Sequence, residues 1–525
     1  MKRRFNTAGP CNPELHYMIP AARRLPEGPG LVEQMAYFVL HAPWQTGKTT
    51  ALRALASELT ATGRFAALMF SCEVGESTGD IYGATQRAIL RELDRRAELA
   101  LPTELRPPAV TLEGDEGLLS AKLVAWARSC PRPIALFFDE IDALRGASLL
   151  AVLRQLRAGF ADRPSSFPAS VVLCGLRDVR DYKAASGGDA SRLGTSSPFN
   201  IKLESLRLGD FTRDKVRELY AQHTADTGQV FTEAALDRAF ELTAGQPWLV
   251  NALAREVVEK MAVPPSEPVT DVHIEEAKER LILARQTHLD SLVARLLEPR
   301  VRRVIGPLLE GGYAGGDTYD DDVQYARDLG LVTITKPLRV ANPIYREVIA
   351  RVLASQAEDS VAVEPKSFVR PDGRLDLRKL LLEFAAFWRE HGEVIAAGMP
   401  YHEVAPQLVL MAYLQRVVNG GGYIDREYGI GRGRIDLLVR WPLKGEGGGR
   451  AWQREALELK VWRTGEKDPR PKGLSQLDGY LERLGLDEGV LVLFDQRKEA
   501  ASPETEAEIE EVPLASGRKA NVLRL

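Results

Sequence analysis

A short segment near the start of the chain carries the residue types that bind phosphate. It reads HAPWQTGKTT from His41 to Thr50 and lies between the apolar run YFVL and the helix-like segment ALRALASELTATG. A loop between a strand and a helix start points backbone N–H groups and the helix dipole at one place, where nucleotide phosphates fit. The candidate nucleotide ligands are Ala42, Pro43, Gln45, Thr46, Gly47, Lys48, Thr49 and Thr50.

The residues of this loop have separate expected roles. Gly47 lets the backbone approach the phosphates, Lys48 reaches the β- and γ-phosphates, and the hydroxyl of Thr49 is a Mg²⁺ ligand. We expect Thr50 to face the sheet. The segment fits G-x-x-x-x-G-K-[ST] except at its first position, where Ala42 replaces glycine. Alanine is small, so we interpret this as a permitted variant, although it tolerates a positive φ less well.

Two acidic residues follow another apolar run, IALFF at 134–138, and are the natural partners of this loop. A strand buried on both faces reads as an unbroken apolar run, and its acids emerge at the carboxyl edge of the sheet. Asp139 is then the expected ligand of the Mg²⁺ shell, and Glu140 the group that orients or deprotonates the attacking water. Each motif alone is common, but the pair predicts a site for ATP with Mg²⁺.

Other residues of this region have weaker signals. His16, Tyr17 and Arg23 in the N-terminal arm are candidates for covering the base, and a structural arm with one aromatic residue packed down fits the sequence equally well. After the apolar run at 169–174, Arg177 or Asp178 occupies the place of a phosphate sensor. Solvated loop charges are the preferred interpretation of these last two residues.

The motifs FFDEID, SPFN, the FT start of a helix at Phe211, and GQPWLVN resemble the archaeal-type, STAND-related branch of AAA-like P-loop ATPases over about residues 1–350. The resemblance implies that Pro247 or its neighbours contact the nucleotide. Trp44 stands where relatives commonly have arginine. Three helices and a hairpin follow in the order of a winged helix, and their arginines are a candidate DNA contact.

The C-terminal third contains charges inside apolar strands. Asp436 lies in RIDLLVR, and Glu458 and Lys460 lie in ALELKVW. Because an unpaired charge on a core strand is costly, such residues indicate a site. Glu458 and Lys460 are two apart and share one face of the strand. Asp436, Glu458 and the carbonyl of Leu459 are candidate ligands of one or two Mg²⁺ ions, and Lys460 is the candidate that steers water or stabilises the transition state.

This pattern resembles the PD-(D/E)XK nuclease superfamily, with its helix, hairpin and helix core. Glu403 matches the first acidic position of that family, and Gln476 and Tyr480 match the Q-x-x-x-Y helix of its RecB-like branch. The resemblance implies a metal-dependent endonuclease that uses Mg²⁺, with Mn²⁺ as a substitute. The alternative is an ordinary hairpin acid, which pairing of Asp436 with Arg432 or Arg434 would favour.

Composition sets the remaining expectations. Among 525 residues, 45% are hydrophobic and 27% charged, and the net charge is -4, so any basic surface is local. Four widely spaced cysteines suggest neither a disulfide framework nor a zinc site. The N-terminus lacks the apolar stretch of a signal peptide and no apolar run is long enough to cross a bilayer. These features predict a cytoplasmic protein without a membrane partner.

The expected fold class is α/β: a P-loop NTPase parallel sheet with a helical lid and a winged helix, followed by an α/β PD-(D/E)XK nuclease-type domain. We expect ATP state to gate the nuclease, nucleic acid to be the partner, DNA more than RNA, and a homo-oligomer to form with nucleotide. The alternative function is an ATP-dependent switch whose nuclease-like domain binds without cleaving. The expected domains are an ATPase core at 1–205, a lid at 206–268, a winged helix at 269–355, a linker at 356–374 and a nuclease-like domain at 375–525.

Overall fold

The fold was derived from a computed structural model. It describes residues 3–79, 81–110, 114–177, 201–284, 292, 294–296, 298–309, 320–358, 368–392, 405–418, 422–430, 433–444, 450–497 and 508–525. The chain divides into two compact units, the first containing residues 1–290 and 319–344 and the second containing residues 291–318 and 345–525. Within the described ranges, every helix is too short or too polar to cross a membrane.

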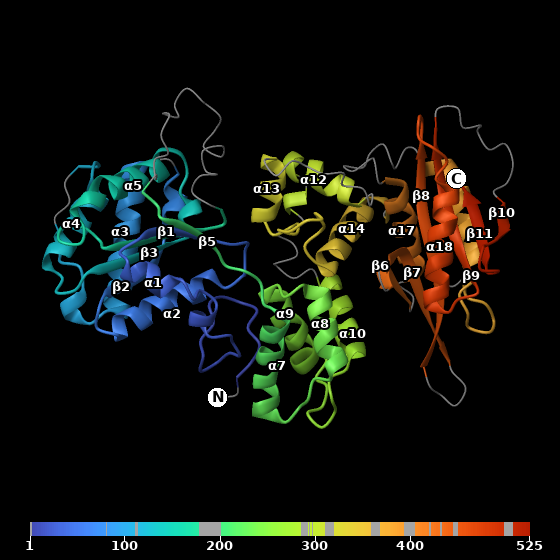
Figure 1. Cartoon of the computed structure of the whole chain (residues 1–525), viewed down its shortest axis with the longest axis horizontal. Coiled ribbons are helices and arrows are strands. Elements are labelled where there is room, and N and C mark those ends of the chain that lie inside the picture. Colours follow the sequence, from blue (N-terminus) through green and yellow to red (C-terminus); the bar gives the residue numbers. More distant parts are fainter. Residues whose placement is uncertain are drawn as a thin grey trace. The chain divides into compact units, whose positions relative to one another are not determined.

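The first unit is built on a parallel sheet in the order β2-β3-β4-β1-β5. Figure 1 labels β1, β2, β3 and β5 of this sheet. Its strands are β1 (Tyr37–His41), β2 (Ala66–Ser71), β3 (Ile134–Asp139), β4 (Ser170–Gly175) and β5 (Glu204–Arg207). One face packs on α1 and α2, and the opposite face packs on α3, α4 and α5. Because both faces are covered, the central strands are apolar throughout, and their polar residues gather at the carboxyl ends.

Helices of the first unit form two groups. Those around the sheet are α1 (Gly28–Glu33), α2 (Lys48–Ala61), α3 (Tyr82–Ala100), α4 (Leu118–Ser129) and α5 (Gly146–Ala158). The others are α7 (Arg213–Thr227), α8 (Glu233–Thr243), α9 (Pro247–Arg255), α10 (Asp271–Leu283) and α13 (Asp321–Asp328). Helices α7 to α10 pack against one another, and Thr212 and Thr232 cap α7 and α8 through their hydroxyl groups.

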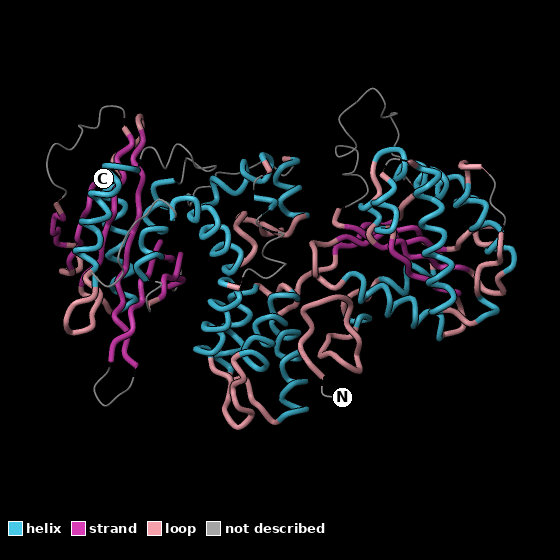
Figure 2. The backbone as a smooth tube through the Cα atoms, turned by 180° about the vertical axis from the view of Figure 1, so that it is seen from behind, coloured by secondary structure: helices cyan, strands magenta, loops and turns pink. Residues whose placement is uncertain are grey.

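The second unit contains a mixed sheet in the order β10-β11-β9-β8-β7-β6, and Figure 2 shows the strands of both sheets in magenta. Strands β6, β7 and β8 are antiparallel, whereas β8, β9 and β11 are parallel. The strands are β6 (Tyr423–Ile430), β7 (Gly433–Lys444), β8 (Arg450–Arg463), β9 (Glu488–Gln496), β10 (Ile509–Pro513) and β11 (Lys519–Arg524). The helices are α12 (Pro299–Leu309), α14 (Pro343–Glu358), α15 (Leu377–Phe387), α17 (Ala405–Val418) and α18 (Arg470–Leu484).

The α/β class and the parallel NTPase sheet are confirmed. The helix, hairpin, helix and closing strand expected in the C-terminal third are present, while β10 and β11 were not expected. The segment predicted as a winged helix, 269–355, is divided between the two units, and its short hairpin is reduced to one bridge between Val332 and Val340. The domain boundaries and the nuclease superfamily remain predictions.

The turn before α9 offers a stability test, because Gly245 has a φ of 80° and lies against the backbone of Phe211. A Cβ at Gly245 would come within 1.9 Å of the Phe211 carbonyl oxygen. We expect Gly245→Ala to lower the free energy of unfolding of the first unit by more than about 3 kcal/mol, since overpacking adds to left-handed strain. Chemical denaturation of the full chain measures this change.

The matched control is Gly228→Ala at the end of α7. Gly228 also has a left-handed backbone, with a φ of 79°, but a Cβ there meets no atom within 4 Å. This variant should lose only about 1 kcal/mol. Equal losses in the two variants would show that the contact with Phe211 is unimportant.

Candidate nucleotide and metal sites

The phosphate loop joins β1 to α2, as the sequence predicted. Left-handed backbone occurs in it at Gln45, with a φ of 56°, and at Gly47, with a φ of 92°. Ala42 is not one of the positive-φ residues, so its methyl group causes no backbone strain. Gly47 precedes the first residue of α2, whose first-turn N–H groups have no acceptors within the helix. The loop therefore fits an anion.

Lys48 and Thr46 hold the loop in shape. The Lys48 ammonium donates to the carbonyl oxygens of Ala42, at 2.7 Å, and Pro43, at 2.9 Å. The Thr46 hydroxyl also donates to the Pro43 oxygen, at 2.9 Å. A phosphate that binds Lys48 must replace these two carbonyl oxygens as its hydrogen-bond acceptors. Because the phosphate is charged and the carbonyls are neutral, its hydrogen bond to the lysine is stronger.

Thr49 and Asp139 meet although β4 separates β1 from β3 in the sheet. The Thr49 hydroxyl donates to Asp139 Oδ2 at 2.7 Å, and Asp139 is only 1% exposed. A hydroxyl and a carboxylate in contact at a helix start fit the protein's share of a Mg²⁺ shell. Thr50 does not have the expected orientation toward the sheet, because its hydroxyl accepts the backbone N–H of Cys11, at 3.0 Å, from the N-terminal arm.

Glu140 is held apart from the loop by the neighbouring strand. Its carboxylate accepts a hydrogen bond from the Ser71 hydroxyl at the end of β2, and its backbone has a φ of 54°. Burial raises the pKa of Glu140, while the bond from Ser71 opposes that rise. An uncommon left-handed backbone in a non-glycine residue is a strained feature of the kind that gathers at functional sites. The predicted role of Glu140 in orienting a water molecule would require its carboxylate to leave Ser71.

Arg24 belongs to the site, and sequence reasoning missed it. Its guanidinium donates to the Thr46 carbonyl at 2.9 Å and to the Gly209 carbonyl at 2.7 Å, and it lies over the ring of Phe211. Burial lowers the pKa of Arg24 to about 10, so the group stays charged at neutral pH. Nothing in the local pattern separates Arg24 from Arg23, which pairs with Glu218 instead.

The other expected residues of the N-terminal arm pack into the protein. Tyr17 is 1% exposed and lies against the rings of Phe5 and His223, which agrees with the structural interpretation of this arm. His16 is also buried. Pro247 begins α9, where proline is favourable, and its contact with nucleotide remains a prediction.

A segment around α13 lies against the phosphate loop and the ends of β4 and β5. Arg177 places its guanidinium over the ring of Tyr325, at 4.0 Å from the centroid, while Asp178 lies outside the described residues. Arg207 donates to the carbonyl of Arg327 and pairs with the buried Asp328. This segment was not expected near the nucleotide site.

Gly330 brings the same segment to the loop itself. A Cβ at Gly330 would come within 2.7 Å of Pro43 Cβ, and Gly330 has a φ of 75°. Only glycine fits that approach without displacing the proline. The contact links residues almost 300 positions apart and is invisible in the sequence pattern.

The C-terminal acids and lysine converge on one face of the second sheet. Lys460 donates to Glu458 Oε1 at 2.6 Å, and its nitrogen is 4.0 Å from Asp436 Oδ2. Asp436 also accepts the backbone N–H of Leu459 at 2.8 Å. The structure therefore brings together the three predicted side chains, one from β7 and two from β8. The metal-binding role of the Leu459 carbonyl remains a prediction.

The electrostatics of this cluster fit a cation. Glu458 is 1% exposed, and burial, with the negative charge of Asp436, raises its pKa to about 7. Among the described atoms, Glu458 Oε2 and Gln476 Oε1 are buried without a hydrogen-bond partner. A divalent ion would neutralise both carboxylates and occupy the free oxygen of Glu458.

The helix over this face supplies the remaining predicted residues. In α18, Tyr480 is buried and packs in the same core as Leu438 and Ala456. Glu403 lies outside the described residues, and so does Arg432. Within the part of the chain that the structure describes, no group of three acidic, histidine or cysteine residues converges as a metal site.

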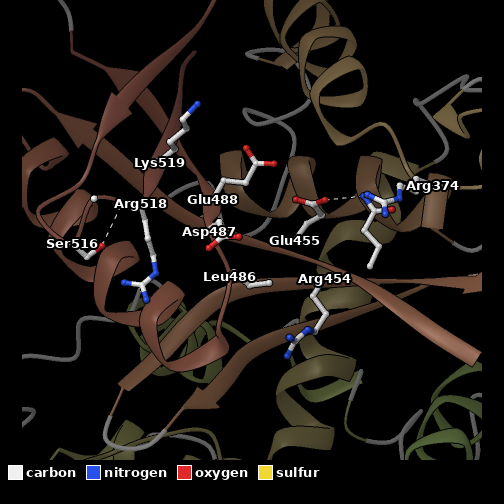
Figure 3. A pocket seen from close by; sticks show the side chains of 11 residues that line it. Arg374, Arg454, Glu455, Leu486, Asp487, Glu488, Ser516, Arg518 and Lys519 are labelled. Carbon is white, nitrogen blue, oxygen red and sulfur yellow. Dashed lines mark hydrogen bonds between the residues drawn. The ribbon is translucent and has the colours of Figure 1, made fainter. Parts of the chain in front are cut away.

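A separate polar cavity of about 650 Å³ lies at the beginning of β9 and β11 (Figure 3). Glu455 and Glu488 line it together with Arg374, Arg454 and Arg518, so its charges largely cancel. Glu455 also accepts a hydrogen bond from Gln453, at 2.7 Å. Side chains alternate along β8, so Glu455 points to the face of the sheet opposite that of Glu458.

Comparison with known proteins finds similarity in the first unit. Residues 33–182 match the family model described as an AAA domain. A search of curated proteins finds no match. Similar solved structures include a Walker-type ATPase of Pyrococcus abyssi (13% identity, TM-score 0.42, 66% of this chain and 99% of that one).

Two further solved structures have similarly low sequence identity and TM-score. The RuvB Holliday junction branch migration motor of Thermotoga maritima has 16% identity and a TM-score of 0.34, over 63% of this chain and 92% of that one. The ORC1 protein of Aeropyrum pernix in complex with DNA has 12% identity and a TM-score of 0.33, over 64% and 93%. The family match and the loop geometry lead to one conclusion: residues 33–182 are an AAA-type P-loop ATPase domain that binds ATP.

Proposed function

We propose that the chain hydrolyses ATP in its first unit, cleaves phosphodiester bonds with a divalent cation in its second unit, and uses nucleotide state to control cleavage. The observation that carries the nuclease is the pair Asp436 and Glu458 with Lys460 between them. Burying two carboxylates and one lysine in a sheet lowers the stability of the fold through desolvation. Their presence therefore favours a role in function.

In the ATPase domain the proposed site residues have separate roles. Lys48 binds the phosphates, Thr49 and Asp139 hold Mg²⁺, and Glu140 orients the attacking water once Ser71 releases it. Arg24 keeps the Thr46 carbonyl turned toward the arm and so fixes the loop.

In the second unit, Asp436 and Glu458 hold the cation, which supplies an activated water molecule and neutralises charge on the phosphate. Lys460 is placed to donate to a phosphate oxygen, because its ammonium lies between both carboxylates. Gln476 and Tyr480 of α18 and Glu403 complete the proposed site. We propose Mg²⁺, with Mn²⁺ as a substitute, and a nucleic-acid substrate, DNA more than RNA.

The path of the chain supports control by ATP. Residues 319–344 belong to the first unit, and the residues before and after them belong to the second unit. This inserted segment contains Gly330 against Pro43 and Tyr325 against Arg177. A change at the phosphate loop therefore acts on a segment tied at both ends to the unit with the candidate nuclease. A nucleotide-dependent homo-oligomer and a cytoplasmic setting are part of the same proposal.

Substitution at Lys48 and Glu140 should separate ATP binding from hydrolysis. Lys48→Ala should bind a fluorescent ATP analogue about 10- to 100-fold more weakly, because a charge-assisted contact is lost. Glu140→Gln should bind normally and hydrolyse at least about 100-fold more slowly. Arg53→Ala, an exposed position on the same helix, is the control. Wild-type affinity in Lys48→Ala would refute the assignment of the phosphate loop.

The nuclease is tested with plasmid, single-stranded DNA and RNA in Mg²⁺ or Mn²⁺. Asp436→Asn and Glu458→Gln should each reduce cleavage at least about 100-fold through loss of a metal ligand. Glu455→Gln, on the opposite face of the same strand, should cleave as wild type. If the wild-type protein cuts none of these substrates, the nuclease proposal is wrong, and the alternative is an ATP-dependent switch whose second unit binds without cleaving.

Control by ATP is tested by measuring cleavage without nucleotide, with ADP and with ATP. The wild-type rate should change at least several-fold between these conditions, because the segment at 319–344 responds to the phosphate loop. Lys48→Ala should give one rate in all three. Equal wild-type rates would disprove the control while leaving both activities in place.

A further inference from the structure

The face that carries Glu458 and Lys460 continues to an aromatic residue. Trp462 is two residues beyond Lys460 on β8, and side chains alternate along a strand, so the three share one face. Trp462 is partly exposed, and its indole N–H donates to the carbonyl of Glu466 at 3.1 Å. An indole thus stands at the carboxyl end of the strand, next to the candidate metal site.

Two arginines lie around this indole: Arg497 directly follows β9, and Arg524 is the last residue of β11. The Arg497 guanidinium lies 3.5 Å from the centroid of the Trp462 ring, and that of Arg524 lies at 5.5 Å. Both donate to Asp495, which is paired with Trp462 in the register of β8 and β9. The cluster therefore combines two cations, one acid and one aromatic ring, and its net charge is positive.

Such a cluster is suited to an unpaired base and its phosphate. Bases stack on indole rings and on guanidinium planes, and arginine adds attraction for the backbone. A base inside a duplex is already stacked on its neighbours and does not offer a free face. Glu458 lies four residues before Trp462 on β8, which is about 13 Å along the strand, or roughly four of the 3.4 Å steps of stacked nucleotides. A base on Trp462 would therefore lie within about four nucleotides of a phosphate at the acid pair.

We propose that Trp462, with Arg497 stacked on its ring, binds an unpaired base of the polynucleotide that enters the candidate metal site. The inference rests on the proposed nuclease function and narrows its substrate to single strands, or to the single-stranded parts of larger nucleic acids. Arg497 and Arg524 are singled out by their position over the Trp462 ring, whereas Arg470 is paired with Glu510 and Arg463 lies near Glu466.

Binding of a short fluorescein-labelled oligothymidylate to the full chain, followed by fluorescence anisotropy in EDTA, tests this proposal without metal or cleavage. Trp462→Ala should bind about 5- to 100-fold more weakly, the range for loss of one stacked base. Trp462→Phe should keep most of the affinity. Trp452→Ala is the matched control, because Trp452 lies on the same strand, ten residues away, and also has an arginine, Arg440, over its ring.

Three further probes separate stacking from a structural role of Trp462: an oligouridylate, a blunt-ended duplex and an abasic strand. The loss in Trp462→Ala should persist on the unpaired DNA or RNA strand and vanish on the duplex and the abasic strand. Unchanged affinity in Trp462→Ala, or an equal loss on all probes, would overturn the proposal. Binding that depends on Trp462 without any Mg²⁺-dependent cleavage would refute the nuclease and leave the base-binding site intact.

Discussion

Both candidate sites depend on a carboxylate that is almost fully removed from water. Asp139 and Glu458 are each 1% exposed. Asp139 ends the apolar strand β3, and Glu458 lies between two leucines in β8. Burial of a charged group is unfavourable unless a partner compensates it. Asp139 has the hydroxyl of Thr49, and Glu458 has the ammonium of Lys460. The sheet positions these pairs, and a cation, as proposed for both sites, would further offset the unfavourable desolvation.

The ATPase domain holds its functional groups in contacts that catalysis must replace. Lys48 is bonded to carbonyls of its own loop, and Glu140 to Ser71. These contacts hold both side chains in place. Arg24 acts differently, because its two bonds to backbone carbonyls join the N-terminal arm to the loop and need not change. The conformation of the phosphate loop is therefore held both by its own hydrogen bonds and by Arg24 of the N-terminal arm.

The second sheet distributes its chemistry along one face. Hydrophobic residues of α18 cover the middle of that face, the acid and lysine cluster follows, and Trp462 with its arginines lies at the carboxyl end. The alternation of side chains places Glu455 on the opposite face of the sheet. A single strand, β8, therefore supplies a candidate metal ligand, Glu458, then the lysine Lys460 and the aromatic ring of Trp462, each two residues apart.

The sequence by itself determined the local elements of both sites. Unbroken apolar runs predicted β1 to β4, because a strand buried on both faces requires apolar residues throughout. The glycine and lysine after the first run predicted the phosphate loop, because a tight turn that binds phosphate requires these residue types. Charges inside apolar runs likewise identified Asp436, Glu458 and Lys460. Only the tertiary structure decided that Arg24 supports the loop, that Thr50 bonds to the arm, that Gly330 meets Pro43, and that Arg497 stacks on Trp462. These contacts join residues distant in the chain, and no periodicity or spacing records which distant segments pack together.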